Sequence, residues 1–496
     1  MKLLKYIGIG LLATVGLTSC SSDYLDTEYT GSLDSDATAD AAGRKPMGFL
    51  NGMWSWMVSY GTVSTAHDDF AFMSILWSTQ LMSEDIAMQG SNWGIYDHQF
   101  DNRLYTYRRT LVDWTTLYTL VAKANEVIAL YLDGGTTDEA KALLGESYAI
   151  RGMAYTYLIQ LYQKYVNTDG SINYDAPGIP LIYTTADGKT TDEINAAKSR
   201  NTVKTVFEAI ESDLTKAVDL LNGYKRSSKN EIDQNVAYGL LARYYLMSQQ
   251  WAKAADAAKA AHAGYNMMDE SGLKDGFMDL SNSEWMWGFN HTAETQTAYP
   301  SFFSMMSTLA PGYAGLAQNT PCIDAKLYSK IADDDYRKTD WFNGPEGNEN
   351  AKTTGSKLPY ANIKFGNDGS WTMDYMFMRA AEMVLIEAEA LAHQNKNTEA
   401  ATVLKELMAK RQPGWNKTSV SVEDVYLQRR IELWGEGFSF FDMKRLNKSV
   451  NRSYSGNNYQ AACAIDVPAG DKRWTYQIPQ KEMQENSMLS DSDQNE

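Results

Sequence analysis

The chain contains few of the residues that build disulfide frameworks and metal sites. Its 496 residues include 3 cysteines and 5 histidines. Cys20 follows an apolar N-terminal segment, which leaves Cys322 and Cys463 in the body of the chain. Two cysteines are too few for a disulfide framework, and neither they nor the histidines are spaced as metal ligands. Cys322 and Cys463 either pair or remain small buried residues, and we expect the second.

The motifs of common catalytic sites are absent as well. The sequence has no Gly-x-Ser-x-Gly, no phosphate-binding loop, no His-Glu-x-x-His and no Cys-x-x-Cys. We therefore predict neither a catalytic centre nor a cofactor. A glycoside hydrolase stays open as an alternative, because such an enzyme needs two opposed carboxylates and the chain has 62 acidic residues. No motif marks such a pair.

Positive charge and long apolar runs are also scarce. The 45 basic and 62 acidic residues give a formal net charge of -17, which argues against binding nucleic-acid backbones or anionic lipid through protein charge. The one marked apolar run, residues 6–17, follows Lys2 and Lys5. It is too short to span a bilayer and is typical of a signal-peptide core.

The residues that end this run, LTSC at 17–20, resemble the lipobox of bacterial lipoproteins. The resemblance implies a signal peptide over residues 1–19 and a mature chain that begins at Cys20, lipidated for example with palmitate. An ordinary secretory signal with an incidental cysteine is the alternative. Residues 20–42 are polar and acidic, and we predict that they form a flexible tether.

Proline is rare, with 11 in the chain, and long stretches carry apolar residues at helical spacing. The spacing predicts helical hairpins at roughly 114–165, 202–265 and 373–411. Within the second, QQWAKAADAAKAA (249–261) is similar to the second helix of a tetratricopeptide unit. Single hairpins cannot bury their apolar faces, so we expect them to stack on one another.

The segments between the hairpins are rich in glycine, asparagine and aromatic residues. They cover roughly 88–107 and 266–372, with one strand-like alternation in EWMWGFN (284–290). We therefore predict a single, mostly α domain over 43–496, a tetratricopeptide-like hairpin scaffold with long irregular aromatic-rich insertions. Binding residues usually lie on such insertions.

Several segments carry a further resemblance. They are ESYAIRGMAYTYLIQLYQKY (146–165), GIPLIY (178–183), SRNTVKTVFEAIESDLTKAVDLL (199–221), AYGLLARYYL (237–246), YMFMRAAEMVLIEAEAL (375–391), RRIELWGEGFSFFDMKRL (429–446) and RWTYQIPQKEM (473–483). Together with the lipobox, and in this order over essentially the whole mature chain, they resemble the SusD/RagB-like outer-membrane lipoproteins of Bacteroidetes. That family captures nutrients, most often glycans, at the cell surface.

The resemblance implies a lipid-anchored protein on the cell exterior that is not an enzyme. It would capture oligosaccharides and deliver them to a SusC-like, TonB-dependent transporter, with the hairpin face against the barrel. A peptide ligand, as in systems of the RagB kind, is the main alternative among binding proteins. A surface glycoside hydrolase and a purely structural tetratricopeptide adaptor are alternatives from other classes.

RIELWGEGFSFFDMKR (430–445) combines charges of both signs with four aromatic residues. A Gly-x-Gly turn at 435–437 has Glu436 at its centre. Arg429, Arg430 and Glu432 precede this turn, and Asp442, Lys444 and Arg445 follow it. The spacing predicts ion pairs between the two flanking helices. We interpret the segment as a structural clamp and not as an active site.

Sugar binding requires flat aromatic faces for the apolar faces of sugar rings and short polar side chains for the hydroxyls. Residues 90–102 and 289–315 supply both. We predict that the residues stacking on sugar rings are Trp93, Tyr299, Tyr313 and Phe302. The predicted hydrogen-bonding partners are Asn92 and Asn290. Core packing under a long loop is the alternative for each aromatic residue, and it is the stronger expectation for Trp285, Trp287 and Phe289.

Overall fold

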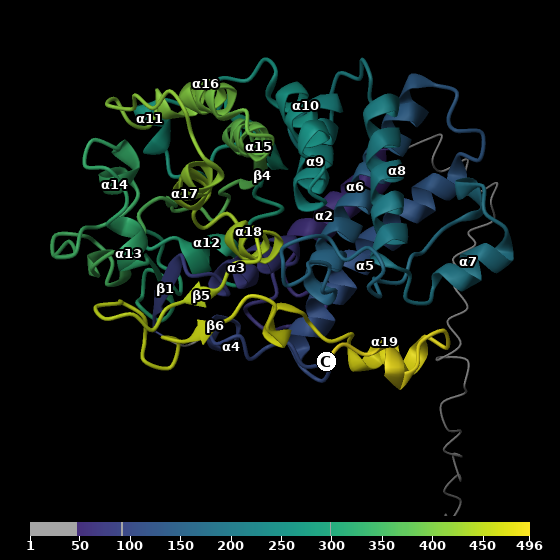
Figure 1. Ribbon diagram of the computed structural model, residues 1–496, viewed down its shortest axis with the longest axis horizontal. Helices are drawn as coiled ribbons and strands as arrows, with labels where there is room; N and C mark the ends of the chain where they lie inside the picture. Colours follow the sequence, from purple (N-terminus) through teal and green to yellow (C-terminus); the bar gives the residue numbers. More distant parts are fainter. Residues whose placement is uncertain (1–46, 91–92, 298) are drawn as a thin grey trace, which may run out of the picture. The chain divides into compact units, whose positions relative to one another are not determined.

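The computed structural model describes residues 47–90, 93–297 and 299–496 (Figure 1). The predicted signal peptide, Cys20, the tether and Asn92 lie outside the described residues. Pro46–Glu496 form one compact unit. Within the described ranges no helix is both long and apolar enough to cross a membrane.

The described part of the chain is mostly helical, as predicted. The α-helices are α2 (Met47–Val58), α3 (Phe72–Leu81), α4 (Ile95–His98), α5 (Arg108–Leu130), α6 (Asp138–Tyr162), α7 (Thr191–Ala197), α8 (Val203–Leu220), α9 (Gln234–Met247), α10 (Trp251–His262), α11 (Glu270–Leu273), α12 (Phe302–Met306), α13 (Ala325–Tyr328), α14 (Tyr336–Asp340), α15 (Ala380–His393), α16 (Asn397–Met408), α17 (Val422–Glu432), α18 (Ser439–Arg445) and α19 (Gln480–Glu485). The strands are β1 (Ile86–Gln89), β2 (Trp285–Phe289), β3 (Thr320–Ile323), β4 (Tyr375–Arg379), β5 (Val450–Asn451) and β6 (Asp466–Val467).

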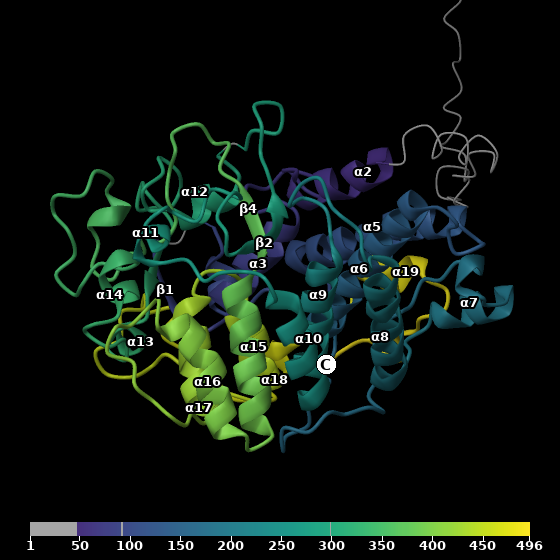
Figure 2. The same ribbon diagram turned by 90° about the horizontal axis from the view of Figure 1, so that it is seen from above.

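The long helices pack in a continuous series, in which α5 lies on α6, α6 on α8, α8 on α9, α9 on α10, and α10 on α15, which in turn packs on α16 and α17. Local sequence supports their start points. Thr202 caps α8 by accepting a hydrogen bond from the Thr205 backbone, and Thr137 caps α6 in the same way. The short helices α11, α13 and α14 and their irregular connections lie to one side of this series, at the left in Figures 1 and 2. This arrangement is the predicted hairpin scaffold with irregular insertions.

The strands differ in one place from the sequence-based expectation. Residues 375–379, predicted as the start of a helix, form β4, which pairs antiparallel with β2, and α15 begins at Ala380. Long-range pairing with β2 overrides the local helical pattern. Trp285, Trp287 and Phe289 of β2 are buried, in agreement with their expected place in the core. Cys322 and Cys463 are buried free thiols, also as expected.

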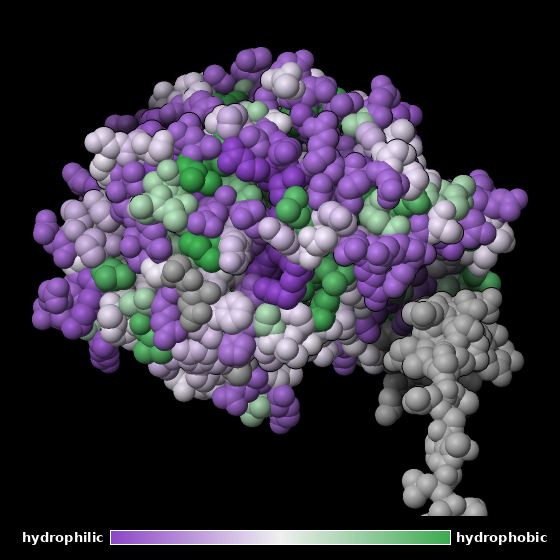
Figure 3. Space-filling view, turned by 90° about the horizontal axis from the view of Figure 1, so that it is seen from below, coloured by the Kyte–Doolittle hydropathy of each residue, from purple (hydrophilic) through white to green (hydrophobic). Residues whose placement is uncertain are grey.

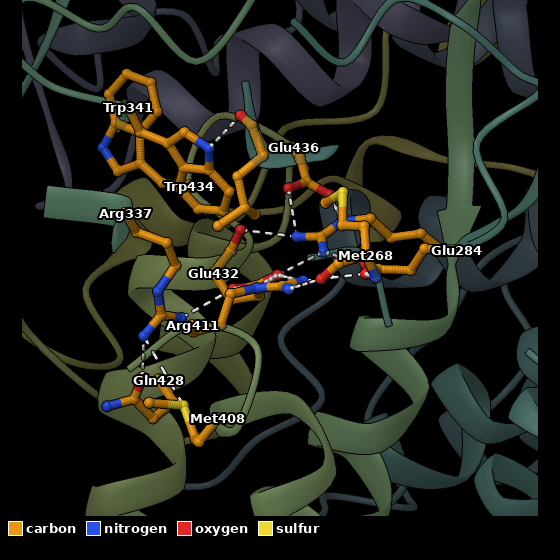
Figure 4. Close-up of polar contacts among 12 residues, drawn as sticks. Met268, Glu284, Arg337, Trp341, Met408, Arg411, Gln428, Glu432, Trp434 and Glu436 are labelled. Carbon is orange, nitrogen blue, oxygen red and sulfur yellow. Dashed lines mark hydrogen bonds and ion pairs between the residues drawn. The ribbon is translucent and has the colours of Figure 1, made fainter. Parts of the chain in front are cut away.

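The segment at 430–445 is a clamp, and its ion pairs reach farther than the two flanking helices. Arg429 of α17 does bind Asp442 of α18, with Nε and Oδ2 3.0 Å apart. Glu432, however, accepts ion pairs from residues distant in sequence, and Figure 4 shows its carboxylate among guanidinium groups. The partners are Arg337 at 2.8 Å, Arg379 at 2.6 Å and Arg411 at 2.8 Å.

Other acids complete this buried network. Glu284 binds Arg379 and Arg411, and Glu436 binds Arg379 and Lys364. Burial alone would raise the pKa of Glu432, but the surrounding guanidinium groups hold that pKa well below its usual value. The network therefore joins β4, α17 and Glu284, the residue before β2, to the segments that carry Arg337 and Arg411.

The Gly-x-Gly turn lets α17 and α18 approach their neighbours closely. Gly435 and Gly437 have φ angles of 80° and 89°. A Cβ atom on Gly435 would lie 2.7 Å from the Phe365 ring, and one on Gly437 would lie 2.6 Å from the Leu76 Cβ. Both positions therefore require glycine.

Candidate ligand-binding site

Three of the predicted stacking residues come together with one histidine. The His67 ring stacks on Trp93, with centroids 5.6 Å apart and planes 20° apart. Tyr299 and Tyr313 meet edge to face at 4.5 Å, and Tyr313 lies 6.4 Å from Trp93. The four rings come from four loops, so the fold gathers residues up to 246 positions apart. We call this group, His67, Trp93, Tyr299 and Tyr313, the Trp93 cluster.

The members of the cluster differ in exposure. Trp93, Tyr299 and His67 are half-buried, whereas Tyr313 is 6% exposed. The Tyr313 hydroxyl shares a hydrogen bond of 2.6 Å with His67 Nδ1. Trp93 and Tyr299 can therefore present ring surface to a ligand, and Tyr313 and His67 support them.

The backbone at Trp93 and Gly94 contacts two neighbouring segments. The Trp93 backbone N–H donates to Asn319 Oδ1 over 3.2 Å. Gly94 has a φ of 74°, and a Cβ atom there would lie 2.6 Å from Leu81 Cδ1 and 2.7 Å from the Trp77 ring. The backbone at Gly94 is thus packed against α3.

A pocket of about 510 Å³ adjoins the cluster and shares Trp93 as a wall. Tyr96 and Tyr107, which are 63% and 38% exposed, add two more aromatic rings to its lining. Asp101, Thr106 and Arg108 supply polar groups. Aromatic faces mixed with a few polar groups in a pocket of this size are typical of small-ligand sites.

The polar floor of this pocket is preorganised by ion pairs. Arg109 is buried and binds Asp68 at 2.8 Å and Asp97 at 3.0 Å. Arg108 pairs with Asp68 through both carboxylate oxygens, at 2.7 and 2.8 Å. Burial would raise the pKa of Asp68, but the two arginines lower it. The carboxylate is therefore ionised and held in place, which suits a hydrogen-bond acceptor and not a general acid.

Two other predicted residues lie elsewhere. Phe302 is 3% exposed and packs edge to face on Phe365, so its ring is part of the core and offers no face to a ligand. Its place at the start of the short helix α12 turns the side chain inward. Asn290 is exposed, but its amide donates to Asp374 over 2.9 Å and so braces the end of β2. Neither residue lines the Trp93 pocket.

The sequence did not single out His67, Tyr96, Tyr107 or Arg108. His67 lies in the connection after α2, outside both predicted insertions, and no spacing links it to Trp93. Tyr96 and Tyr107 fall within the predicted insertion at 88–107, but their exposure becomes evident only in the fold. Among the described residues, no group of three or more histidine, cysteine or acidic side chains is placed to hold a metal ion.

We expect Tyr313→Phe to lower both stability and ligand affinity modestly. The change keeps the ring but removes the hydrogen bond to His67, which is worth about 1 kcal/mol. Melting curves and calorimetric titration should show a small drop in melting temperature and an affinity loss of about two- to fivefold. Tyr174→Phe, at an exposed tyrosine outside the cluster, should change neither. Identical behaviour of the two variants would contradict the supporting role of Tyr313.

Asp113 lies behind the pocket and should make stability depend on pH. It is fully buried, neither carboxylate oxygen has a hydrogen-bond partner within the described part of the chain, and Arg109 Nη1 is 3.9 Å away. Burial raises the pKa of Asp113 to about 7, with Arg109 opposing the shift and Asp97 and Asp69 adding to it. The folded state therefore binds the proton more tightly than the unfolded state does, where the pKa is about 3.9.

The stability that protonated Asp113 contributes is present below pH 4 and is lost as the pH rises through about 7. We expect Asp113→Asn to melt at a higher temperature than the unmodified protein at pH 8, with little difference at pH 4.5. Melting curves at both pH values test this. An equal effect of the substitution at both pH values would contradict it.

Comparison with known proteins places the chain in a family. A family model described as starch-binding, associating with the outer membrane, matches residues 62–246, and the model of the SusD family matches residues 251–496. A SusD-like carbohydrate-binding protein from Bacteroides vulgatus has a similar structure, with a TM-score of 0.76 and 25% identity over 91% of this chain and 97% of that one. No curated protein matches the chain.

Two more distant solved structures have the same fold. A laminarin-binding SusD-like protein has a TM-score of 0.68 at 18% identity, covering 91% of this chain and 98% of its own. Surface glycan-binding protein A from Bacteroides uniformis has a TM-score of 0.64 at 16% identity, covering 91% and 99%. The two family models together match most of the chain, including nearly all of the helical scaffold from α5 onward. The chain therefore belongs to the SusD family.

Proposed function

We propose that this protein captures oligosaccharides at the cell surface and holds them at the Trp93 cluster and its adjoining pocket. The observation that carries the proposal is the convergence of Trp93 and Tyr299 with a pocket lined by Tyr96, Tyr107 and fixed polar groups. Indole and phenol rings stack on the apolar faces of sugars, and ion-paired aspartate and arginine side chains bind hydroxyl groups.

The surface hydropathy and the pocket volume favour a polar, hydroxyl-rich ligand rather than a broad interface with another protein. Figure 3 views the side on which α4 lies in Figure 1, and hydrophobic residues there are scattered among hydrophilic ones. A large apolar patch, the usual mark of a docking surface, is not visible on this face. The pocket volume of about 510 Å³ is in the range of small-ligand sites.

Calorimetric titration against a panel of neutral oligosaccharides and a panel of short peptides tests the proposal. We expect binding of at least one oligosaccharide and no release of reducing ends on prolonged incubation, since the protein would bind without hydrolysing. Binding of peptides alone would favour a nutrient system of the RagB kind, and release of reducing ends would identify a glycoside hydrolase.

The proposal includes delivery of the ligand to a SusC-like, TonB-dependent transporter, with the protein facing the cell exterior on a lipid anchor at Cys20. Its support is the family and the lipobox-like LTSC. Co-purification of the transporter with the tagged protein from outer membranes tests the partnership. Recovery of the protein without any such barrel would contradict it.

We expect Cys20→Ala to give a folded protein that no longer fractionates with the outer membrane. The acyl chains on Cys20 are the proposed anchor, and attachment of this kind depends on lipid chains and not on protein charge. Cell fractionation and a melting curve of the variant test this. Continued recovery of Cys20→Ala in the outer-membrane fraction would require a second anchor.

A further inference from the structure

A second cleft lies on α17, separate from the Trp93 pocket. Its volume is about 540 Å³, and none of its lining residues lines the Trp93 pocket. Glu423, Tyr426, Leu427 and Arg430 form one wall because residues at i, i+3, i+4 and i+7 share a helix face. The remaining walls come from distant segments, namely Glu84, Lys330, Lys448, Ser449 and Asn451. We call this space the α17 cleft.

Positive groups surround the aromatic wall of the α17 cleft. Lys448 Nζ lies 4.7 Å from the centre of the Tyr426 ring, and the Arg430 guanidinium lies 5.7 Å from it. Arg430 is fixed, because its Nε donates to Asp85 over 2.7 Å and its Nη2 lies 3.1 Å from Glu84. The positive charge of Arg430 is thus already balanced by the buried carboxylate of Asp85 and the half-buried carboxylate of Glu84.

The other two cations are available to a ligand. Lys448 pairs with Glu423 at 2.7 Å, but the Glu423 side chain is 70% exposed and can be displaced at little cost. Lys330 is exposed and has no ion-pair partner among the residues that the structure describes. Partial burial and then the charges of Arg430 and Lys326 lower the pKa of Lys330, and the charges of Glu84 and Asp324 oppose this shift. An anion beside Lys330 would relieve this repulsion.

Tyr426 contributes its ring to the cleft wall and no polar contact. The side chain is 5% exposed, and its hydroxyl has no hydrogen-bond partner within the described residues. Leaving a buried hydroxyl unpaired is unfavourable. The hydroxyl oxygen is itself closed to solvent, so a molecule seated in the cleft can meet only the ring of Tyr426.

These features together define the chemistry of the ligand. Lys330 is the cation of the cleft without an ion-pair partner among the described residues, and one negative charge suffices because Glu84 and Glu423 already pair with Arg430 and Lys448. Asn451 is exposed and Ser449 half-buried, so both can bind hydroxyl groups, while Leu427 offers an apolar surface. A single carboxylate, several hydroxyls and one apolar face are the features of a uronic acid. We propose that the α17 cleft is a second binding site, which takes a carboxylate-bearing sugar.

The test titrates the full mature protein with an acidic disaccharide of uronic acids and with its carboxyl-reduced, neutral counterpart. We expect the acidic disaccharide to bind at least about tenfold more tightly, as a charge-assisted contact predicts. Its affinity should fall as salt rises, because the pairs are partly exposed. Equal affinity for the two disaccharides, or no binding of either, would overturn the proposal.

Matched variants locate the site. Lys330→Gln should weaken binding of the acidic disaccharide about tenfold. Lys326→Gln, at a nearby exposed lysine that does not line the cleft, should leave it unchanged. Tyr426→Phe should leave both the affinity and the melting temperature nearly unchanged, because the lost hydroxyl has no partner in the described part of the fold and no access to the cleft. Equal affinities for Lys330→Gln and Lys326→Gln would overturn the proposal.

Trp93→Ala separates this site from the Trp93 cluster. We expect this variant to bind the acidic disaccharide as the unmodified protein does, even though its affinity for neutral oligosaccharides falls. Loss of the acidic disaccharide in Trp93→Ala would place that ligand at the Trp93 cluster and overturn the second site. Equal binding of an acidic peptide would show that the cleft recognises a carboxylate without the sugar, and would overturn the assignment to a uronic acid.

Discussion

Glu432→Gln is expected to lower the free energy of unfolding by about 3–5 kcal/mol, the range found when one partner of a buried ion network is neutralised. Glu432 is fully buried and pairs with Arg337, Arg379 and Arg411 at 2.6–2.8 Å. Glutamine keeps the shape of the side chain but removes its negative charge. The three guanidinium groups would then face less negative charge in the buried network. Chemical denaturation measures the loss directly.

Glu399→Gln is the matched control, because Glu399 is exposed on α16. We expect its unfolding free energy to change by less than about 0.5 kcal/mol. The affinity of folded Glu432→Gln for ligand should be retained, since no residue of the network lines the Trp93 pocket. A large loss of affinity at unchanged stability would instead make the segment at 430–445 a binding site.

Trp93→Ala is expected to weaken binding of the cognate oligosaccharide about tenfold or more. An indole stacked on a sugar ring removes apolar area worth about 1–3 kcal/mol at about 25 cal/mol per Å², and about 1.4 kcal/mol corresponds to one decade in affinity. The fold should survive, because Trp93 is half-buried on a loop and not inside a helix pair. Titration calorimetry with melting curves measures both effects.

Trp251→Ala provides the control for the loss of a large side chain. Trp251 is also half-buried, at the start of α10, where it stacks on His393. We expect this variant to lose some thermal stability and to keep its affinity for the oligosaccharide. If Trp93→Ala kept full affinity and lost only stability, Trp93 would be a packing residue and the ligand would have to bind elsewhere.

The helical scaffold could be predicted because its signals are local. Apolar residues at helical spacing mark α5, α6 and α8, and the cap residues Thr137 and Thr202 mark the starts of α6 and α8. The strand β4 was missed because its stability comes from pairing with β2, about 90 residues earlier in the chain. The spacing of apolar residues within a short stretch of sequence cannot reveal pairing with a distant strand.

The candidate site could be predicted in part for the same reason. Trp93 and Tyr299 stood out as aromatic residues in polar loops, and the fold brings them close to Tyr313. Phe302 shared that composition, but its helix turns it into the core. His67 carried no local signal, because its role depends on its position next to rings from three other loops.

The ion pairs of the clamp also include partners that are distant in sequence and that local spacing cannot predict. The charges at 429–445 suggested pairing between neighbouring helices, and Arg429 with Asp442 fulfils that expectation. The strongest partners of Glu432 lie 21, 53 and 95 positions away. Only the folded chain reveals which guanidinium groups meet this carboxylate.

A crystal structure of the protein in complex with a neutral oligosaccharide that binds in titration tests the central claim most directly. We expect one sugar ring against the indole of Trp93 and the phenol of Tyr299, with hydroxyl groups near Asp101 or Arg108 of the adjoining pocket. An oligosaccharide bound away from Trp93, with the Trp93 cluster and its pocket empty, would contradict the account.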